Sequence, residues 1–126
     1  MPEKKSPRRK LILLAESNQA HAVLLISILA QQTAHHAVVI TTGQHTIHIL
    51  TKLIPDLLIF PEHLVDMSGM QLYKQIQTVE KLRPLPLLML RAHTTIHRSK
   101  FICLGTPFDL EEFLHAVEAL LPDTPF

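Results

Sequence analysis

The sequence predicts an α/β fold in which helices cover both faces of a parallel sheet. Short apolar runs alternate with segments of helical periodicity along the 126 residues, as in proteins built from strand–helix–strand units. Two of these runs, Leu11–Leu14 and Leu57–Phe60, are apolar throughout, which is typical of parallel strands buried on both faces. The chain length is that of one domain with a single core.

The first two helices are predicted from their ends and their apolar spacing. The first follows the strand Leu11–Leu14 and runs from about Asn18, a favourable N-cap residue, to about Gln32. Its predicted core residues are Val23, Leu24, Ile28 and Leu29. A β-branched strand over Ala37–Ile40 and a turn lead into the second helix, Gln44–Leu53, which Pro55 stops. Its apolar residues are Ile47, Ile49, Leu50 and Leu53.

A third helix and two further strands are predicted beyond Leu57–Phe60. The helix opens at Met67-Ser68-Gly69 and ends near Leu82, ahead of Pro84. Its apolar residues recur at i, i+4 and i+7, namely Leu72, Ile76 and Val79. The strands that follow are Leu87–Leu90 and Ile102–Leu104.

The last helix has the clearest start signal. Asp109 can cap its first turn, and Glu112, three residues later, can complete a capping box. Pro122 follows its end. The predicted buried stripe is Leu110, Phe113, Leu114, Val117 and Leu121.

One helix of the alternation is missing. Fourteen residues lie between Arg91 and Thr106, and the last of them form the fifth strand. A short helix with both connections needs about twenty residues. We therefore expect a single turn or a loop around Thr94–Ser99 in place of the fourth helix.

Charge and composition divide the chain and exclude some classes of function. Residues 1–10 carry five cations against one acid, so we predict a disordered basic arm, a folded domain over 11–122 and a tail over 123–126. The arm is either a solvated tail or makes weak contacts with nucleic acid or anionic lipid. The net charge of +1 provides no overall field for nucleic acid. No apolar stretch is long enough to cross a membrane, and no secretory signal is recognised.

The single cysteine, Cys103, excludes an intrachain disulfide and suits a reducing cytoplasm. Its position in a strand favours a small buried core residue over a redox sensor. The sequence has no glycine-rich phosphate loop, so nucleotide binding has no support. We expect no cofactor.

Four motifs, in the order in which they occur, are similar to those of a known family. They are Pro55-Asp56-Leu57-Leu58, Gly69, Ala92-His93 and Pro107-Phe108-Asp109-Leu110-Glu111-Glu112. With the order of elements they resemble the receiver domain of bacterial two-component response regulators, over about Lys10–Leu121. The resemblance implies a flavodoxin-like sheet of five parallel strands in the order 2-1-3-4-5. It also implies a cis peptide bond between Thr106 and Pro107.

The resemblance implies that phosphotransfer chemistry is lost. Receiver domains hold Mg²⁺ with an acidic pair after the first strand, where this chain has Ala15 and Glu16. Their phosphoacceptor aspartate ends the third strand, where this chain has Pro61. Proline carries no nucleophile, and a single carboxylate is a poor seat for Mg²⁺. Strand alternation argues against Glu62 as a shifted acceptor, because it turns that side chain away from the direction of residue 61.

Three further positions depart from the receiver pattern. Arg91 replaces the hydroxyl residue after the fourth strand, Cys103 the aromatic residue of the fifth, and Thr106 the phosphate-pairing lysine. Arg91 would place a positive charge near the metal position, and we expect it to form an ion pair with Glu16. The chain is therefore interpreted as a pseudo-receiver that is not an enzyme.

The nine histidines raise the question of a metal site. His45 and His48 are spaced i, i+3, and His93 and His97 i, i+4, which would place each pair on one helical face. No nearby cysteine completes a ligand set, so solvated surface histidines are the favoured interpretation. The combination that best fits a metal site is His63, His93 and Glu16.

Two functions remain open. The first is a phosphorylation-independent signalling module that acts through protein–protein interaction, because the missing helix leaves apolar area uncovered. Its predicted surface comprises Ile96, Phe101, Phe113 and Leu114. The expected partner is another protein or a second copy of the chain, and neither a membrane nor nucleic acid. The alternative is a small-molecule or anion sensor at the C-terminal edge of the sheet, using Arg91, His93 and Thr106.

Overall fold

The computed structural model describes residues 9–92, 95–98 and 100–121. Its strands form one sheet in the order β2-β1-β3-β4-β6-β5. In chain order they are β1 (Leu11–Ala15), β2 (His36–Ile40), β3 (Leu57–Pro61), β4 (Leu87–Ala92), β5 (Ile96–His97) and β6 (Phe101–Thr106). Neighbouring strands run parallel except β5, which is antiparallel to β6. The flavodoxin-like order of the five parallel strands is confirmed, with β6 as the fifth.

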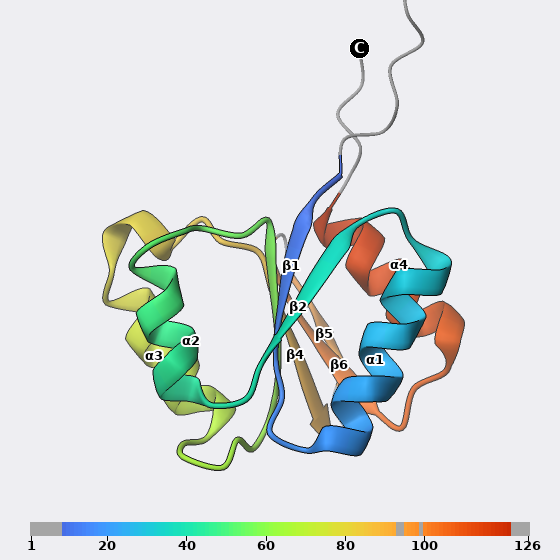
Figure 1. The fold of residues 1–126 in the computed structure, drawn as a ribbon, viewed down its shortest axis with the longest axis horizontal. Helices are drawn as coiled ribbons and strands as arrows, with labels where there is room; N and C mark the ends of the chain where they lie inside the picture. The colour runs from blue at the N-terminus through green and yellow to red at the C-terminus, as the bar shows by residue number, and fades with distance from the viewer. Residues whose placement is uncertain (1–8, 93–94, 99, 122–126) are drawn as a thin grey trace, which may run out of the picture.

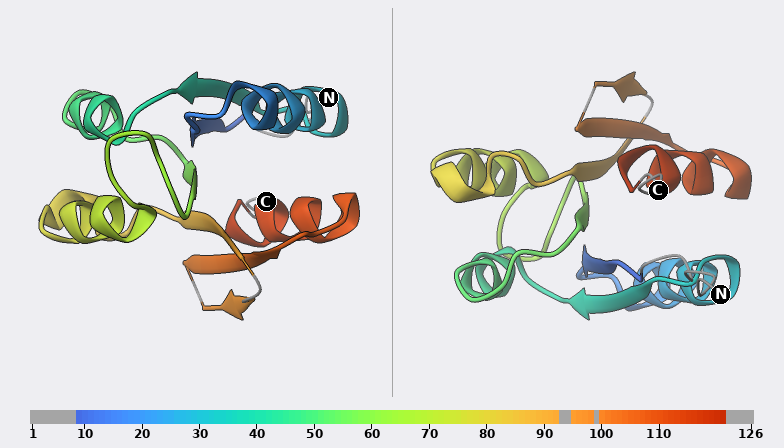
Figure 2. Two further views of the ribbon diagram at one scale, coloured as in Figure 1. Left: turned by 90° about the horizontal axis from the view of Figure 1, so that it is seen from below. Right: turned by 90° about the horizontal axis from the view of Figure 1, so that it is seen from above.

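Helices cover both faces of this sheet. In the described part of the chain they are α1 (Gln19–Gln32), α2 (Gly43–Leu50), α3 (Gly69–Gln77) and α4 (Leu110–Leu120), with a 3-10 turn η1 (Glu80–Leu82) after α3. α1 and α4 lie on one face, and α2 and α3 lie on the other (Figure 1). Figure 2 shows the same three layers from both ends, with β5 at the outer edge beyond β6.

Each face of the sheet has its own core. On one face Ile12 packs in a buried cluster with Leu29 of α1 and Phe113 of α4. On the other, Leu13 packs in a buried cluster with Leu72 of α3. Neighbouring residues of a strand point to opposite faces, so a strand covered on both sides is apolar at every position. This is why the central strands were recognisable as continuous apolar runs.

The connection between β4 and β6 contains β5, which forms an antiparallel hairpin with β6. Within the described residues it contains no helix, as the residue count predicted, and β5 turns back to pair with β6, placing Ile96 opposite Cys103. The N–H of Gly105 donates to Thr95 Oγ1 at 3.0 Å, which attaches the start of the hairpin to β6. Residues 93, 94 and 99 lie outside the described residues.

The predicted helix caps are confirmed. Asn18 accepts a hydrogen bond at the start of α1, and Asp109 and Glu112 form the reciprocal capping box of α4. Ser68 caps α3 in the same way. These short polar side chains satisfy N–H groups that have no partner within the helix.

Several predicted core residues of the helices face solvent instead. α1 buries Ala22, Leu25 and Leu29, whereas Val23 and Leu24 are exposed. α1 is apolar on more than one side, so periodicity alone could not identify the side that packs on the sheet. At or beyond the ends of the other helices, three further predicted residues are also exposed: Leu53, Val79 and Leu110.

The described chain begins within the predicted basic arm, at Arg9. Lys10, assigned to the disordered arm, is held by β2: its N–H donates to His35 Nδ1 at 3.1 Å and its carbonyl accepts from His36 N at 2.9 Å. Residues 1–8 and 122–126 lie outside the described residues. The Thr106–Pro107 bond is cis, as the resemblance implied. No helix in the described residues is both long and apolar enough to cross a membrane.

Candidate functional site

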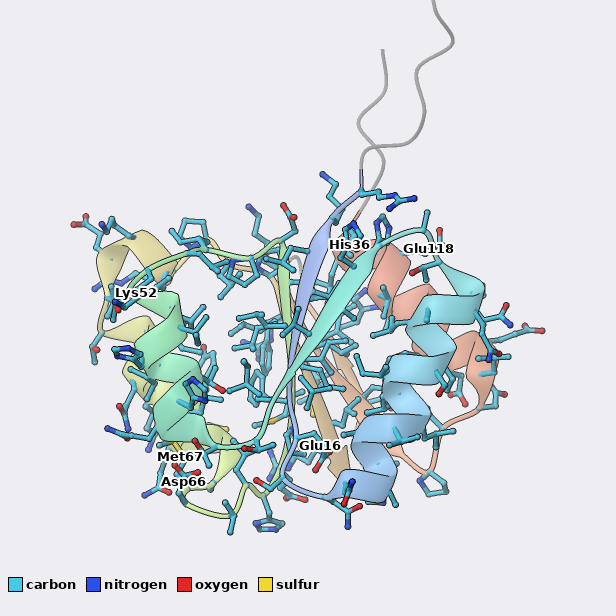
Figure 3. The ribbon with its side chains drawn as sticks, viewed as in Figure 1. Glu16, His36, Lys52, Asp66, Met67 and Glu118 are labelled. Atoms are coloured by element: carbon cyan, nitrogen blue, oxygen red, sulfur yellow. The ribbon has the colours of Figure 1, made fainter. Side chains whose placement is uncertain are left out.

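The candidate site lies at the carboxyl edge, by which we mean the C-terminal ends of the parallel strands and the loops that follow them. Ala15 ends β1 and Pro61 ends β3. Arg91 is the next-to-last residue of β4, and Thr106 is the last residue of β6. Figure 3 shows Glu16 at this edge together with Asp66 and Met67, while His36 and Glu118 lie at the opposite edge. The sheet therefore brings the predicted degenerate positions to one end of the molecule.

Glu16 is hydrogen-bonded to the backbone around it. Its residue is only 5% exposed, and one carboxylate oxygen accepts a hydrogen bond from the Asn18 N–H at 3.0 Å. Its own N–H donates to the Ile40 carbonyl at 2.9 Å. The one acidic residue retained from the receiver pattern thus fixes the loop between β1 and α1.

The expected ion pair between Glu16 and Arg91 is wrong. Arg91 Nε lies 3.4 Å from Glu62 Oε2, and the two side chains are 43% and 35% exposed. The sheet order explains the choice of partner, because β3 lies between β1 and β4. Glu62 directly follows β3 and is therefore one strand away from Arg91, whereas Glu16 is two strands away.

The first residue of α3, Gly69, lies in close contact with Pro61. The Pro61 carbonyl lies so close to Gly69 that a Cβ atom at Gly69 would overlap it, and Met89 Cε would lie 2.9 Å from the same atom. The Gly69 N–H donates to the Glu62 carbonyl at 2.7 Å. Only a glycine lets the helix start approach the end of β3 this closely.

Ser17 connects three loops of the carboxyl edge. Its hydroxyl donates to the Thr41 carbonyl at 2.6 Å, after β2, and accepts from the Val65 N–H at 2.9 Å, after β3. One side chain from the loop after β1 therefore joins the loops after β2 and β3.

Asp66 caps α2 from another loop. Its two carboxylate oxygens accept the N–H groups of Gly43 at 2.8 Å and Gln44 at 2.9 Å. These hydrogen bonds, the one from Gln44 foremost, lower the pKa of Asp66. Thr42 accepts from the next N–H, that of His45, so the first three donors of α2 are all satisfied.

A shallow hollow lies at the carboxyl edge, between α1 and β2. Its volume is about 420 Å³, and Glu16 is the only charged residue in its lining. Neither Arg91 nor Thr106 lines it, so the hollow does not have the cationic character that the anion-sensor alternative requires. His93, the third residue of that alternative, lies outside the described residues.

The described residues contain no group of three histidine, cysteine or carboxylate side chains placed to hold a metal ion. The combination of His63, His93 and Glu16 includes one residue outside the described part of the chain. His45 and His48 are both exposed on α2. Cys103 is buried in β6, as predicted, and burial raises the pKa of its thiol.

The predicted interaction surface is divided by the sheet. Ile96 pairs opposite Cys103, so it points to the α3 face together with Phe101, two residues before Cys103. Phe113 is fully buried in the other core, at 0% exposure, and Leu114 packs against that same core. Phe113 and Leu114 therefore do not belong to a surface with Ile96, because α4 buries its apolar stripe against the opposite face.

Two important residues of the carboxyl edge were missed from sequence. Ser17 and Asp66 each bond groups more than twenty residues away along the chain. A polar residue in a loop at the C-terminal end of a strand is the only local signal for such a role. The hydrogen-bond partners of Ser17 and Asp66 could not be inferred from sequence, because they depend on which loops the sheet order brings together.

The comparisons with known proteins agree with this geometry at the level of fold. No protein-family model matches the chain, and no curated protein matches its sequence. The receiver domain of a sensor histidine kinase from Pseudomonas aeruginosa, solved with magnesium in its active-site cleft, superposes with a TM-score of 0.78 at 16% identity, covering 90% of this chain and 98% of its own. A chemotaxis response regulator of Vibrio cholerae gives 0.77 at 16%, covering 90% and 99%.

A third structure supports the same conclusion. The receiver domain of a signal transduction histidine kinase from Syntrophus aciditrophicus gives a TM-score of 0.76 at 20% identity, covering 89% of this chain and 90% of its own. The similarity extends over nearly the whole of each domain. The chain therefore has the fold of response-regulator receiver domains.

Proposed function

We propose that this chain is a receiver-like signalling module that acts through protein–protein interaction and does not undergo phosphotransfer. The observation that carries the proposal is Pro61 at the end of β3, the position where receiver domains place their phosphoacceptor aspartate. Proline has no side-chain oxygen, so an acyl phosphate cannot form there.

The surrounding residues support the loss of chemistry. Glu16 already accepts a backbone hydrogen bond, and Ala15 beside it has no ligand atom. The guanidinium of Arg91 lies against Glu62, so a cation approaching these carboxylates would meet a fixed positive charge. Mg²⁺ prefers octahedral oxygen coordination with one or two carboxylates. At this edge Glu16 already accepts a backbone hydrogen bond and Glu62 already contacts Arg91.

The proposed protein–protein interaction depends on the β5–β6 hairpin, which stands in place of a helix. We call the two apolar groups on the α3 side of this hairpin, Ile96 and Phe101, the hairpin surface. Ile96 is 37% exposed, and Phe101 is half-buried against Tyr73, whose ring centroid lies 5.2 Å away. Exposed apolar groups at the edge of a sheet are typical of a surface that binds a partner.

The proposed setting is a reducing compartment, the cytoplasm. Cys103 is a free thiol buried in the core, and it is the only cysteine. Neither feature depends on an oxidising environment.

The test of the interaction is the substitution Ile96→Asp, with Val65→Asp as the matched control. Val65 is 75% exposed at the carboxyl edge. Val65→Asp therefore introduces the same charge as Ile96→Asp, but on a different surface. We expect Ile96→Asp to change the mass measured by light scattering, or to lose a partner recovered by the wild type, while Val65→Asp behaves as the wild type. Equal behaviour of both variants and the wild type would contradict the hairpin surface as the site of action.

A further inference from the structure

Two groups of like charge lie on opposite sides of the sheet. α4 and its cap carry only acids among charged residues: Asp109, Glu111, Glu112 and Glu118. Three cations, Arg83, Arg98 and Lys100, gather in one hollow beside α3. Figure 1 shows α3 and α4 on opposite faces. The only ion pair within the described residues is that of Arg91 with Glu62. The acids of α4 and the cations beside α3 therefore do not neutralise each other.

This basic hollow has an apolar floor and a cationic rim. Its volume is about 310 Å³, and none of its described lining residues is acidic. The lining consists of Tyr73, Gln77, Arg83, Leu85, Leu87, Arg98, Lys100 and Phe101. Arg83 is held in place, because its Nε donates to the Gln77 carbonyl at 3.0 Å. The hollow lies where the missing helix leaves α3 and β6 uncovered, and it shares Phe101 with the hairpin surface.

The exposed side of α4 has the complementary arrangement. Leu110 is 44% exposed, although it lies between the acidic residues Asp109 and Glu111. Asp109 and Glu112 are used by the capping box, but Glu111 and Glu118 are exposed without a hydrogen bond to any described residue. They lie at i and i+7, on one side of the helix. The helix thus presents an apolar side chain at its start, with one free carboxylate beside it and a second two turns further along.

We propose that the basic hollow of one copy of this chain binds the exposed acidic side of α4, from Leu110 to Glu118, of a second copy. Leu110 of the second copy occupies the apolar floor, and Glu111 and Glu118 face Arg98 and Lys100 at the rim. The inference rests on the proposed function, because it names a second copy of the chain as the partner of the hairpin region. The two surfaces differ, so the contact is heterologous and can repeat from copy to copy.

The test uses two variants that each remove one side of the contact. Arg98→Gln with Lys100→Gln neutralises the hollow, and Glu111→Gln with Glu118→Gln neutralises the helix. All four side chains are exposed, so the fold should be retained, which circular dichroism and the denaturant midpoint verify. Lys52→Gln with Lys74→Gln is the control, with the same loss of charge outside the hollow.

Light scattering over a range of protein concentrations gives the expected pattern. The wild type and the control should grow in mass beyond a dimer as concentration rises, and the growth should weaken at 1 M salt, where the screening length is about 3 Å. Each double variant alone should remain a monomer. An equimolar mixture of the two should form a dimer and nothing larger, because each variant retains one working surface.

Three results would overturn the second copy as partner. A wild type that stays monomeric at every concentration excludes it, as does a mixture of the two variants that stays monomeric. Binding of an acidic peptide or of single-stranded oligothymidine to a monomeric wild type would assign the hollow to another protein or to nucleic acid. If these tests fail but Ile96→Asp still abolishes recovery of a partner, the proposed function stands with a different partner.

Discussion

The carboxyl edge and the hairpin region use their polar and charged residues in opposite ways. At the carboxyl edge, Glu16, Ser17 and Asp66 are each bonded to backbone groups of the loops. In the hairpin region, Arg98 and Lys100 project from an exposed connection and have no ion-pair partner among the described residues. One region is closed by internal hydrogen bonds, and the other leaves charge and apolar surface available.

Under the proposed function, this difference marks where the chain departs from a receiver that carries out phosphotransfer. In a working receiver the loops at the carboxyl edge must admit a metal ion and a phosphoryl group. Here the same loops are tied to one another, which favours a rigid support over a reaction site. The loss of one helix has the reverse effect at the edge of the sheet, because it uncovers side chains that a helix would have buried.

The largest expected effect concerns the close approach of α3 to β3. Gly69→Ala should destabilise the protein by about 3 kcal/mol, because the new methyl group meets the Pro61 carbonyl, which cannot move without disturbing the sheet. The denaturant midpoint measures the effect. Gly43→Ala is the control: its methyl group would meet the flexible side chain of Met67, so its cost should be clearly smaller. Equal midpoints for the two variants would contradict the account of this contact.

Ser17→Ala should have an intermediate effect. It removes the hydroxyl that joins the Thr41 carbonyl to the Val65 N–H, at a cost of about 1 kcal/mol, since both groups are near solvent and can bond water instead. Ser27→Ala in α1 provides a comparison, because no hydrogen bond of the Ser27 side chain joins loops. Amide hydrogen exchange should also accelerate at Val65 in Ser17→Ala. Unchanged exchange there would show that Ser17 does not connect the loops.

Asp66→Asn tests the charged cap of α2. It should cost about 1 kcal/mol at pH 7, because the amide has one acceptor oxygen for two N–H groups and no charge at the helix start. The pKa of Asp66 is lowered in the folded protein, so its stabilisation is complete above the unfolded value of about 3.9 and is lost as the pH falls through the folded value.

The difference between wild type and Asp66→Asn should therefore be constant from pH 7 to about 5 and shrink below about 4. Unfolding free energies at several pH values measure it, with Glu80→Gln as an exposed control. A difference that grows as the pH falls would contradict the assigned sign.

Arg91→Ala should have the smallest effect. Its pair with Glu62 is partly exposed on both sides, and such pairs contribute between zero and about 1 kcal/mol. We expect a change within about 0.5 kcal/mol in the unfolding free energy, smaller still at high salt. A loss of about 2 kcal/mol or more would indicate that Arg91 compensates a buried charge, contrary to the observed exposure.

The sequence predicted the sheet better than the details of the site. Buried strands such as Leu57–Pro61 are apolar at every position, and caps such as Asp109 act on their own helix, so both are local signals. The partner of Arg91 was predicted wrongly, because it depends on which strands are neighbours. Phe113 was placed correctly in the buried stripe of its helix but wrongly in the interaction surface, because helical periodicity shows that a stripe exists without showing how much of it the sheet covers.

The most direct test of the central claim is whether the protein accepts a phosphoryl group. Purified protein is incubated with acetyl phosphate or phosphoramidate and Mg²⁺, and its intact mass is then measured, with a receiver domain that retains the aspartate as positive control. Because Pro61 ends β3 and Arg91 pairs with Glu62, we expect no phosphoryl adduct under conditions that modify the control. A stoichiometric adduct that hydroxylamine removes would contradict the account.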